Sequence, residues 1–268
     1  MSFISSQINS IMVRSNPGIA IRRPWGSLFA IIVICATAGT SEGAAPGVGP
    51  ESVSSAAQDN LVVPDSVFLL CEIETFSFGN VGGLGGSDCW GWSAPDSSEY
   101  AIMGTLNGLT FVNVTTLEVV TTIPGPTIAC SKYWRDMRTY QHYCYCVSEC
   151  SGTNQGLMIV DLQYLPDSVH LVGTFDTSPN GDSTSHNLGI DTVTGFLYIV
   201  GKTTFPNPAM HIYDLADPEN PTFVGSFGNS PGFHDINVHN DTAYIAEGFA
   251  PFFSIYDMSV KTPPTLLA

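Results

Sequence analysis

A pair of polar residues recurs four times along this chain of 268 residues, each time at the start of a stretch with strand-like alternation. The four pairs are Ser87-Asp88, Arg135-Asp136, His186-Asn187 and His234-Asp235. The carboxylates of Asp88, Asp136 and Asp235 could hold a hard cation such as Ca²⁺, which takes about six to eight oxygen ligands. The amide of the third pair would add one more oxygen. The pairs therefore form a candidate metal or ligand site.

The same residues also suit catalysis or a purely structural role. His186 and His234 could transfer protons while Arg135 stabilises an anion, as a hydrolase or lyase requires. Alternatively, a recurrent Asp or Asn in a repeat protein can accept backbone N–H groups and lock one unit to the next. A neighbouring His can satisfy a carbonyl in the same way. The residues alone leave metal or ligand binding, catalysis and structural locking open.

These pairs lie within four copies of a longer repeat. Each copy contains a short apolar strand closed by an acidic or amide residue, and successive strands begin 48, 53 and 43 residues apart. The strands span 109–113, 157–161, 210–214 and 253–257. A period of about 40–50 residues with several strands in each period is typical of a β-propeller. The chain is therefore expected to be all-β.

Each unit is interpreted as four strands, a to d, with the polar pair at the start of strand a. Strand a is innermost in a propeller, so the pairs should converge near one mouth of the central channel. Strand c ends in a residue predicted to bond its own turn: Asn113, Asp161, Asp214 or Asp257. We expect four full four-stranded blades and one orphan N-terminal strand at 66–76. A closed ring would need more sequence, so the ring is expected to be C-terminally incomplete, with a four-bladed ring as the alternative.

The N-terminus resembles a secretory signal. A basic segment ends at Arg22-Arg23, and the apolar run 28–38 closes with a small-x-small cleavage pattern, Ala36-Thr37-Ala38. The run is shorter than the roughly 20 residues that span a bilayer. We therefore predict a signal peptide at 1–38, a disordered leader at 39–60 and the propeller at 61–268, in a secreted, extracellular or cell-surface protein with no transmembrane span. An uncleaved signal anchor is the alternative.

The charge of the chain restricts its partners. Lys and Arg number 8 against 24 Asp and Glu, which gives a formal net charge of −16. So acidic a surface repels phosphate backbones, which argues against nucleic acid and anionic membranes. The expected partner is an extracellular protein, a carbohydrate or a small polar ligand. Calcium is the only cofactor that the pattern suggests.

Cysteines and glycosylation sequons fit an oxidising compartment. Six of the seven cysteines lie beyond the signal, and the Cys130–Cys150 disulfide is predicted because the loops before strand a and after strand b lie on one side of blade two. Cys144 and Cys146 alternate within a strand and read as disulfide or buried thiols rather than zinc ligands. Asn113 and Asn240 begin Asn-x-Thr sequons.

The motifs together resemble a known family. Across 66–259 their order is similar to that of the LVIVD-repeat proteins of the choice-of-anchor B family. The segments that carry the resemblance are 87–92, 133–136, 156–161, 185–188, 217–221 and 233–236. The resemblance implies an extracytoplasmic propeller with more blades than are present here, and no established activity. We therefore expect a binding module acting through the channel mouth; the competing hypothesis is a metal-assisted or His-dependent hydrolase or lyase there.

Overall fold

The computed structural model describes residues 10–13, 70–74, 86–105, 107–126, 134–150, 155–176, 184–202, 209–228, 232–248 and 252–268. Every element in these ranges is a strand, and none of them is a helix able to cross a membrane. Apart from β1 (Ser10–Val13), the predicted signal and leader lie outside the described residues. β1 pairs antiparallel with β2 (Leu70–Glu74), so the strand expected to be an orphan has a partner.

The other sixteen strands form four antiparallel sheets, in each of which neighbouring strands follow one another along the chain. Blade one contains β3 (Gly86–Ser93), β4 (Glu99–Thr105), β5 (Gly108–Asn113) and β6 (Glu118–Pro124). Blade two contains β7 (Arg135–Tyr140), β8 (Tyr143–Ser148), β9 (Leu157–Asp161) and β10 (His170–Phe175). Blade three contains β11 (Ser185–Asp191), β12 (Phe196–Lys202), β13 (Met210–Asp214) and β14 (Thr222–Phe227). Blade four contains β15 (Asp235–His239), β16 (Thr242–Glu247), β17 (Phe252–Asp257) and β18 (Thr265–Leu266).

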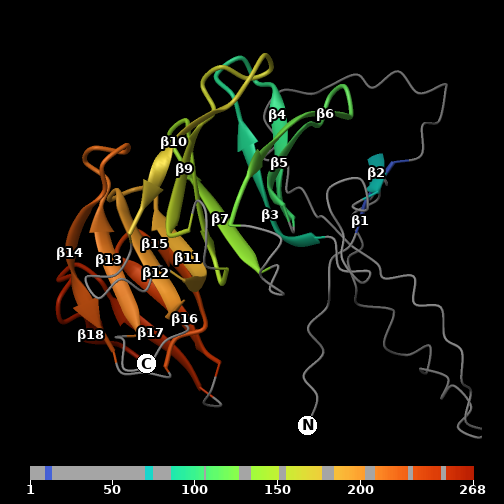
Figure 1. Cartoon of the computed structure of the whole chain (residues 1–268). Helices are drawn as coiled ribbons and strands as arrows, with labels where there is room; N and C mark the ends of the chain where they lie inside the picture. Colours follow the sequence, from blue (N-terminus) through green and yellow to red (C-terminus); the bar gives the residue numbers. More distant parts are fainter. Residues whose placement is uncertain are drawn as a thin grey trace, which may run out of the picture.

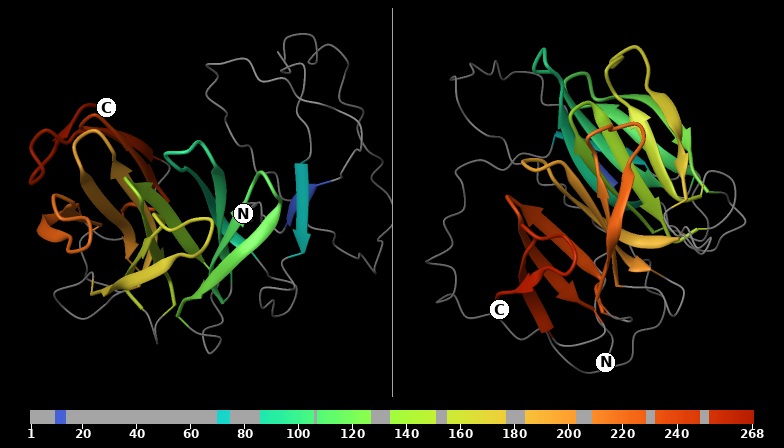
Figure 2. Two further views of the ribbon diagram at one scale, coloured as in Figure 1. Left: turned by 90° about the horizontal axis from the view of Figure 1, so that it is seen from above. Right: turned by 90° about the vertical axis from the view of Figure 1, so that its left-hand side faces the viewer.

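The predicted four-stranded blades are thus confirmed, and the fold is a β-propeller. The sheets fan out in chain order, as the green-to-red colouring of Figures 1 and 2 shows. Their first strands, β3, β7, β11 and β15, pack against one another in that order. No such extended packing joins β15 back to β3 in the part of the chain that the structure describes.

The core is divided into layers between consecutive blades. Blades two and three each contribute apolar side chains to the clusters on both of their faces, because alternate residues of a strand point to opposite sides. For example, Ile102 of blade one packs in the same cluster as Met137 of blade two, and Tyr198 of blade three clusters with Ile236 of blade four. Blade four differs on its far face, where Tyr244 is 42% exposed.

The turns after the third strands are confirmed. The Oδ1 atoms of Asp161, Asp214 and Asp257 each accept a hydrogen bond from the backbone N–H two residues on, at 2.9, 2.8 and 2.8 Å. Asn113 does the same with Thr115 at 2.9 Å. These side chains replace part of the backbone turn and are structural. Glycosylation at Asn113 or at Asn240, which is exposed in a turn, stays a prediction.

Among the residues that the structure describes, Cys144 and Cys146 are buried thiols that form no disulfide. Burial raises the pKa of the Cys146 thiol to about 12 and that of Cys144 well above its ordinary value. Of the two interpretations of this pair, the structure therefore selects the buried thiol. Cys150 is not among these thiols, and Cys130 lies outside the described residues, so the Cys130–Cys150 pairing stays a prediction.

Candidate functional site

The first two polar pairs tie blade one to blade two. The Ser87 hydroxyl donates to the backbone oxygen of Arg135 and accepts from its N–H, both at 2.9 Å. One hydroxyl thus satisfies both backbone groups of a residue in the neighbouring blade. Ser87 therefore serves the interface between blades.

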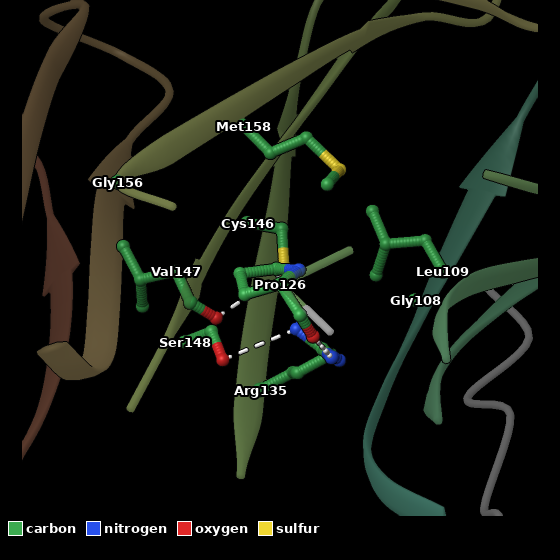
Figure 3. Close-up of a pocket in the computed structure, with 9 residues that line it drawn as sticks. All are labelled: Gly108, Leu109, Pro126, Arg135, Cys146, Val147, Ser148, Gly156 and Met158. Atoms are coloured by element: carbon green, nitrogen blue, oxygen red, sulfur yellow. Dashed lines mark hydrogen bonds between the residues drawn. The ribbon is translucent and has the colours of Figure 1, made fainter. Parts of the chain in front are cut away.

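Arg135 is only 2% exposed, and its guanidinium points into the same interface. Nε donates to the Thr105 oxygen at 2.6 Å. Nη2 donates to the Pro126 oxygen at 2.9 Å and Nη1 to the Ser148 hydroxyl at 3.1 Å (Figure 3). The pocket drawn around it has no room for a water-sized molecule. Burial lowers the pKa of Arg135. Arg135 therefore links backbone carbonyl groups by hydrogen bonds, and the pocket beside it cannot bring a ligand into contact with it.

Asp136 and Asp88 share one cation, the guanidinium of Arg138. Its Nη1 donates to Asp136 at 2.5 Å and to Asp88 at 3.1 Å. Burial, followed by the hydrogen bond with Asp88, raises the pKa of Asp136 well above its ordinary value. Asp136 also accepts from the backbone N–H of Leu188 in blade three at 3.2 Å. Asp136 therefore joins blades in the way that the structural interpretation of the pairs predicts.

These carboxylates do not fit the suggested Ca²⁺ site. Asp88 and Asp136 already face Arg138, and Asp235 is exposed, with one oxygen bonded to the N–H of Ile236 at 2.7 Å. Within the described ranges, no three His, Cys, Asp or Glu side chains are grouped so as to hold a metal ion. Asn187 is 9% exposed, and its Oδ1 has no hydrogen-bond partner. Among these residues the guanidinium occupies the place that the sequence analysis gave to a metal.

The two predicted histidines do meet, and Trp134 and Glu149 lie beside them. The ring of His186 lies 4.3 Å from that of His234, between centroids, and 6.1 Å from that of Trp134. His186 Nδ1 lies 2.6 Å from the Glu149 carboxylate. We call His186, His234, Trp134 and Glu149 the histidine cluster; they come from blades two, three and four.

Glycine makes room for the histidine cluster. A Cβ at Gly248 would lie 2.4 Å from the Cβ of His234, and one at Gly201 would lie 2.5 Å from the Cβ of His186. Both histidine side chains remain partly exposed. Burial, followed by the proximity of His186, lowers the pKa of His234, so this ring is neutral at pH 7. The cluster therefore offers aromatic rings, among them the neutral imidazole of His234, beside the carboxylate of Glu149.

The structure thus separates the residues proposed for catalysis. Arg135 is held between blades one and two, whereas His186 and His234 meet between blades three and four. The His186–Glu149 contact could accept or donate a proton, but the predicted anion-stabilising group is not beside it. Arg138 was missed although a signal existed: it follows Asp136 by two residues and therefore points to the same side of the strand.

Comparison with solved structures gives distant likenesses. A functionally unknown protein from Desulfotomaculum acetoxidans DSM 771 superposes with a TM-score of 0.52 at 13% identity, over 75% of this chain and 58% of that one. A putative 6-phosphogluconolactonase from Bacteroides fragilis NCTC 9343 gives 0.47 at 12% identity, over 66% and 52% of the two chains. The WD40 repeats of RRP9 give 0.45 at 12%, over 66% and 49%.

No protein-family model matches the chain, and no curated protein sequence matches it. The chain spans a little over half the length of the first of these solved structures. At 13% identity that likeness concerns the fold alone. Together with the four blades described above, it identifies the architecture as a β-propeller and leaves the activity to be inferred from the site.

Proposed function

We propose that this protein is a secreted or cell-surface β-propeller of the LVIVD-repeat type, which binds an extracellular partner through the histidine cluster. One observation carries the proposal: of the polar pairs that begin the inner strands, those in blades one and two are largely consumed by contacts between blades. Those in blades three and four leave His186 and His234 partly exposed beside Trp134. The histidine cluster therefore offers a partly exposed surface to which a partner could bind.

Catalysis at the same place is the weaker candidate. A His-dependent hydrolase or lyase would need a group that stabilises the developing anion close to the proton-transferring histidine. Arg135 was the residue proposed for that role, and its hydrogen bonds to Thr105 and Pro126 hold it in a different interface. A metal-assisted reaction lacks support from Asp88 and Asp136, whose carboxylates already face Arg138.

The chemistry of the cluster favours a carbohydrate or protein surface as partner. Trp134 and the histidine rings provide apolar faces with polar edges, and such groups are common where proteins meet sugars or other proteins. The net charge of −16 is unfavourable for nucleic acid. The signal-like segment 1–38 and the order of the repeat motifs support the extracellular location and the LVIVD type.

The binding proposal is tested with the full-length chain on two immobilised panels, a glycan array and an array of cell-surface ectodomains. The wild-type protein should bind members of at least one panel, and His186→Ala/His234→Ala should weaken that binding about tenfold or more. His170→Ala, on the exposed outer strand of blade two, is the matched control and should leave binding unchanged. Absence of binding by folded wild type, or equal binding by the double variant, would overturn the proposal.

The location is tested separately by expressing the full chain in a host with a secretory pathway. We expect protein in the medium whose N-terminus, read by Edman sequencing, starts near residue 39. Retention in the cell with residues 1–38 intact would contradict secretion.

A further inference from the structure

A pocket opens between blades three and four, apart from the contact between the two histidine rings. Its volume is about 450 Å³, within the range of about 300–1,000 Å³ that is usual for small-molecule sites. Of the residues that the structure describes, six line it: Phe227, Gly228, Gly232, Phe233, Glu247 and Tyr256. Blade three supplies the end of β14, and blade four supplies the segment before β15 and parts of β16 and β17.

Three aromatic rings form much of the wall. The Phe227 and Tyr256 rings lie 5.3 Å apart, between centroids, and are inclined at 73°. Phe233 lies 6.0 Å from Tyr256 at 64°. Phe227 and Phe233 are stacked, with centroids 6.1 Å apart and planes inclined at 29°. Tyr256 therefore meets both phenylalanines edge to face. The three rings thus pack against one another, and their outer faces and edges form one side of the pocket, where a cation could lie against them.

A glycine at the rim is needed to keep this arrangement. Gly228 has a φ of +80°, a left-handed conformation that side chains other than glycine disfavour. A Cβ added there would also lie 2.8 Å from the ring of Phe233 and 3.0 Å from the Cβ of Ala209. Glycine at this position therefore allows the backbone to lie against the Phe233 ring.

The charged group on the wall is a carboxylate. Glu247 lies at the end of β16, and its Oε1 accepts a hydrogen bond from the Ser254 hydroxyl. Burial, followed by the charge of Glu247, raises the pKa of Tyr256, which agrees with a phenol close to this carboxylate. None of the six lining residues is Lys or Arg. Among the described residues that line the pocket, a bound cation would thus meet one negative charge and no positive one.

We propose that this pocket binds an alkylated ammonium group, such as a quaternary ammonium head. Aromatic faces attract cations through their quadrupole, and the attraction is strongest for cations that are easily desolvated. Alkyl groups on the nitrogen suit the phenylalanine walls, and Glu247 supplies the opposite charge. The same chemistry occurs elsewhere in this chain, where Arg138 lies 4.5 Å from the Trp90 ring centroid and Lys261 lies 4.1 Å from that of Phe196.

The test compares choline with its neutral isostere, 3,3-dimethyl-1-butanol, by isothermal titration calorimetry on the full-length protein. The two probes share shape and apolar surface, so a difference in affinity measures the response to the charge. Choline should bind at least about tenfold more tightly than the alcohol, since cation–π and carboxylate contacts act on it alone. Equal affinity for the two probes, or no choline binding by the folded protein, would overturn the proposal.

Variants then locate the site. Glu247→Gln keeps the shape and removes the charge, so choline affinity should fall about tenfold while that of the alcohol stays unchanged. Glu118→Gln, on the exposed strand β6, is the matched control and should change neither affinity. Phe227→Leu keeps apolar volume but removes a ring, and it should weaken choline more than the alcohol. Unchanged choline binding in both Glu247→Gln and Phe227→Leu would refute this location.

Two further measurements keep the result unambiguous. Thermal unfolding of each variant should remain a single transition close to that of wild type, which shows that lost binding is not lost folding. His186→Ala/His234→Ala should keep choline binding, because neither histidine lines this pocket. The proposal for the histidine cluster and the proposal for the ammonium pocket can therefore fail independently.

Discussion

The interface between blades one and two and the interface between blades three and four use the same position of the repeat in opposite ways. At the start of β7, Arg135 is 2% exposed and hydrogen-bonds across to blade one. At the equivalent position before β15, His234 stays partly exposed and lies against another ring, that of His186. At this position the interface between blades one and two is therefore filled by buried hydrogen bonds. The interface between blades three and four instead leaves His234 partly exposed and lies next to a pocket.

The difference lies in what the neighbouring blade offers. Blade one presents the oxygens of Thr105 and Pro126, which a buried guanidinium can satisfy. Beside His234, blade three instead presents the ring of His186, and Gly248 of blade four itself leaves the space that the His234 side chain occupies. A repeat position fixes where a side chain lies, whereas its role depends on the blade next to it.

The strongest test of this contrast is Arg135→Met. Removing the guanidinium takes away the donors that Arg135 supplies to the oxygens of Thr105 and Pro126, at a cost of about 1–3 kcal/mol each. We expect the free energy of unfolding to fall by about 3–5 kcal/mol in urea titrations. His234→Ala, at the same register, should cost about 1 kcal/mol or less. Similar losses in the two variants would remove the distinction between the interfaces.

A smaller effect is expected at Asp191 of blade three, whose carboxylate accepts hydrogen bonds from the backbone of blade four. Asp191 accepts from the N–H groups of Asn240 and Asp241, at 3.1 and 2.8 Å. Asp191→Ala leaves these two donors unpaired, so unfolding free energy should fall by about 2–3 kcal/mol. A smaller loss of unfolding free energy than in His234→Ala would show that Asp191 contributes little to holding blades three and four together.

The stabilisation that Asp191 contributes should depend on pH. Burial alone would raise the pKa of Asp191, but its four hydrogen-bond donors hold it below the ordinary value of 3.8. The stabilisation is therefore present above about pH 4 and is lost as the pH falls through the lowered pKa. Acid unfolding of Asp191→Ala should begin from a lower stability and lose less of it below pH 4. Parallel acid titrations of the two proteins would contradict this.

The smallest effect belongs to His234. Its pKa is lowered from 6.5, so between that value and the lowered one the unfolded chain binds more protons than the folded one. Stability should decline slightly as the pH drops below about 6.5. The groups that face this ring are His186, Asp235 and Glu149. Melting temperatures at pH 7.5 and 5.5 should therefore differ less in His234→Gln than in wild type, while His170→Gln should behave as wild type.

Much of the architecture could be predicted because it is encoded locally. The repeated strands and the turn at Asp161, Asp214 and Asp257 depend on residues close together in the chain, and the structure confirms them. The propeller follows from the period of these units.

The site could be predicted only in part, because it depends on neighbours about 50 residues away. The recurrence of the polar pairs indicated one shared role, yet Asp136 turned out to lock blades while His186 joined an aromatic cluster. The ammonium pocket had no signal in the sequence analysis. Its walls come from β14, β16 and β17, whose aromatic residues look like ordinary core positions until the blades are placed side by side.

The side-chain-bonded turns after the third strands have a consequence for the order of folding. Each is completed within two residues, so the hairpin that it closes can form before any contact with another blade. The ties between blades, such as that of Ser87 to Arg135, close loops of about 50 residues and pay a larger entropic cost. Individual blades should therefore form first and dock afterwards, as in repeat proteins whose units contact only the adjacent units.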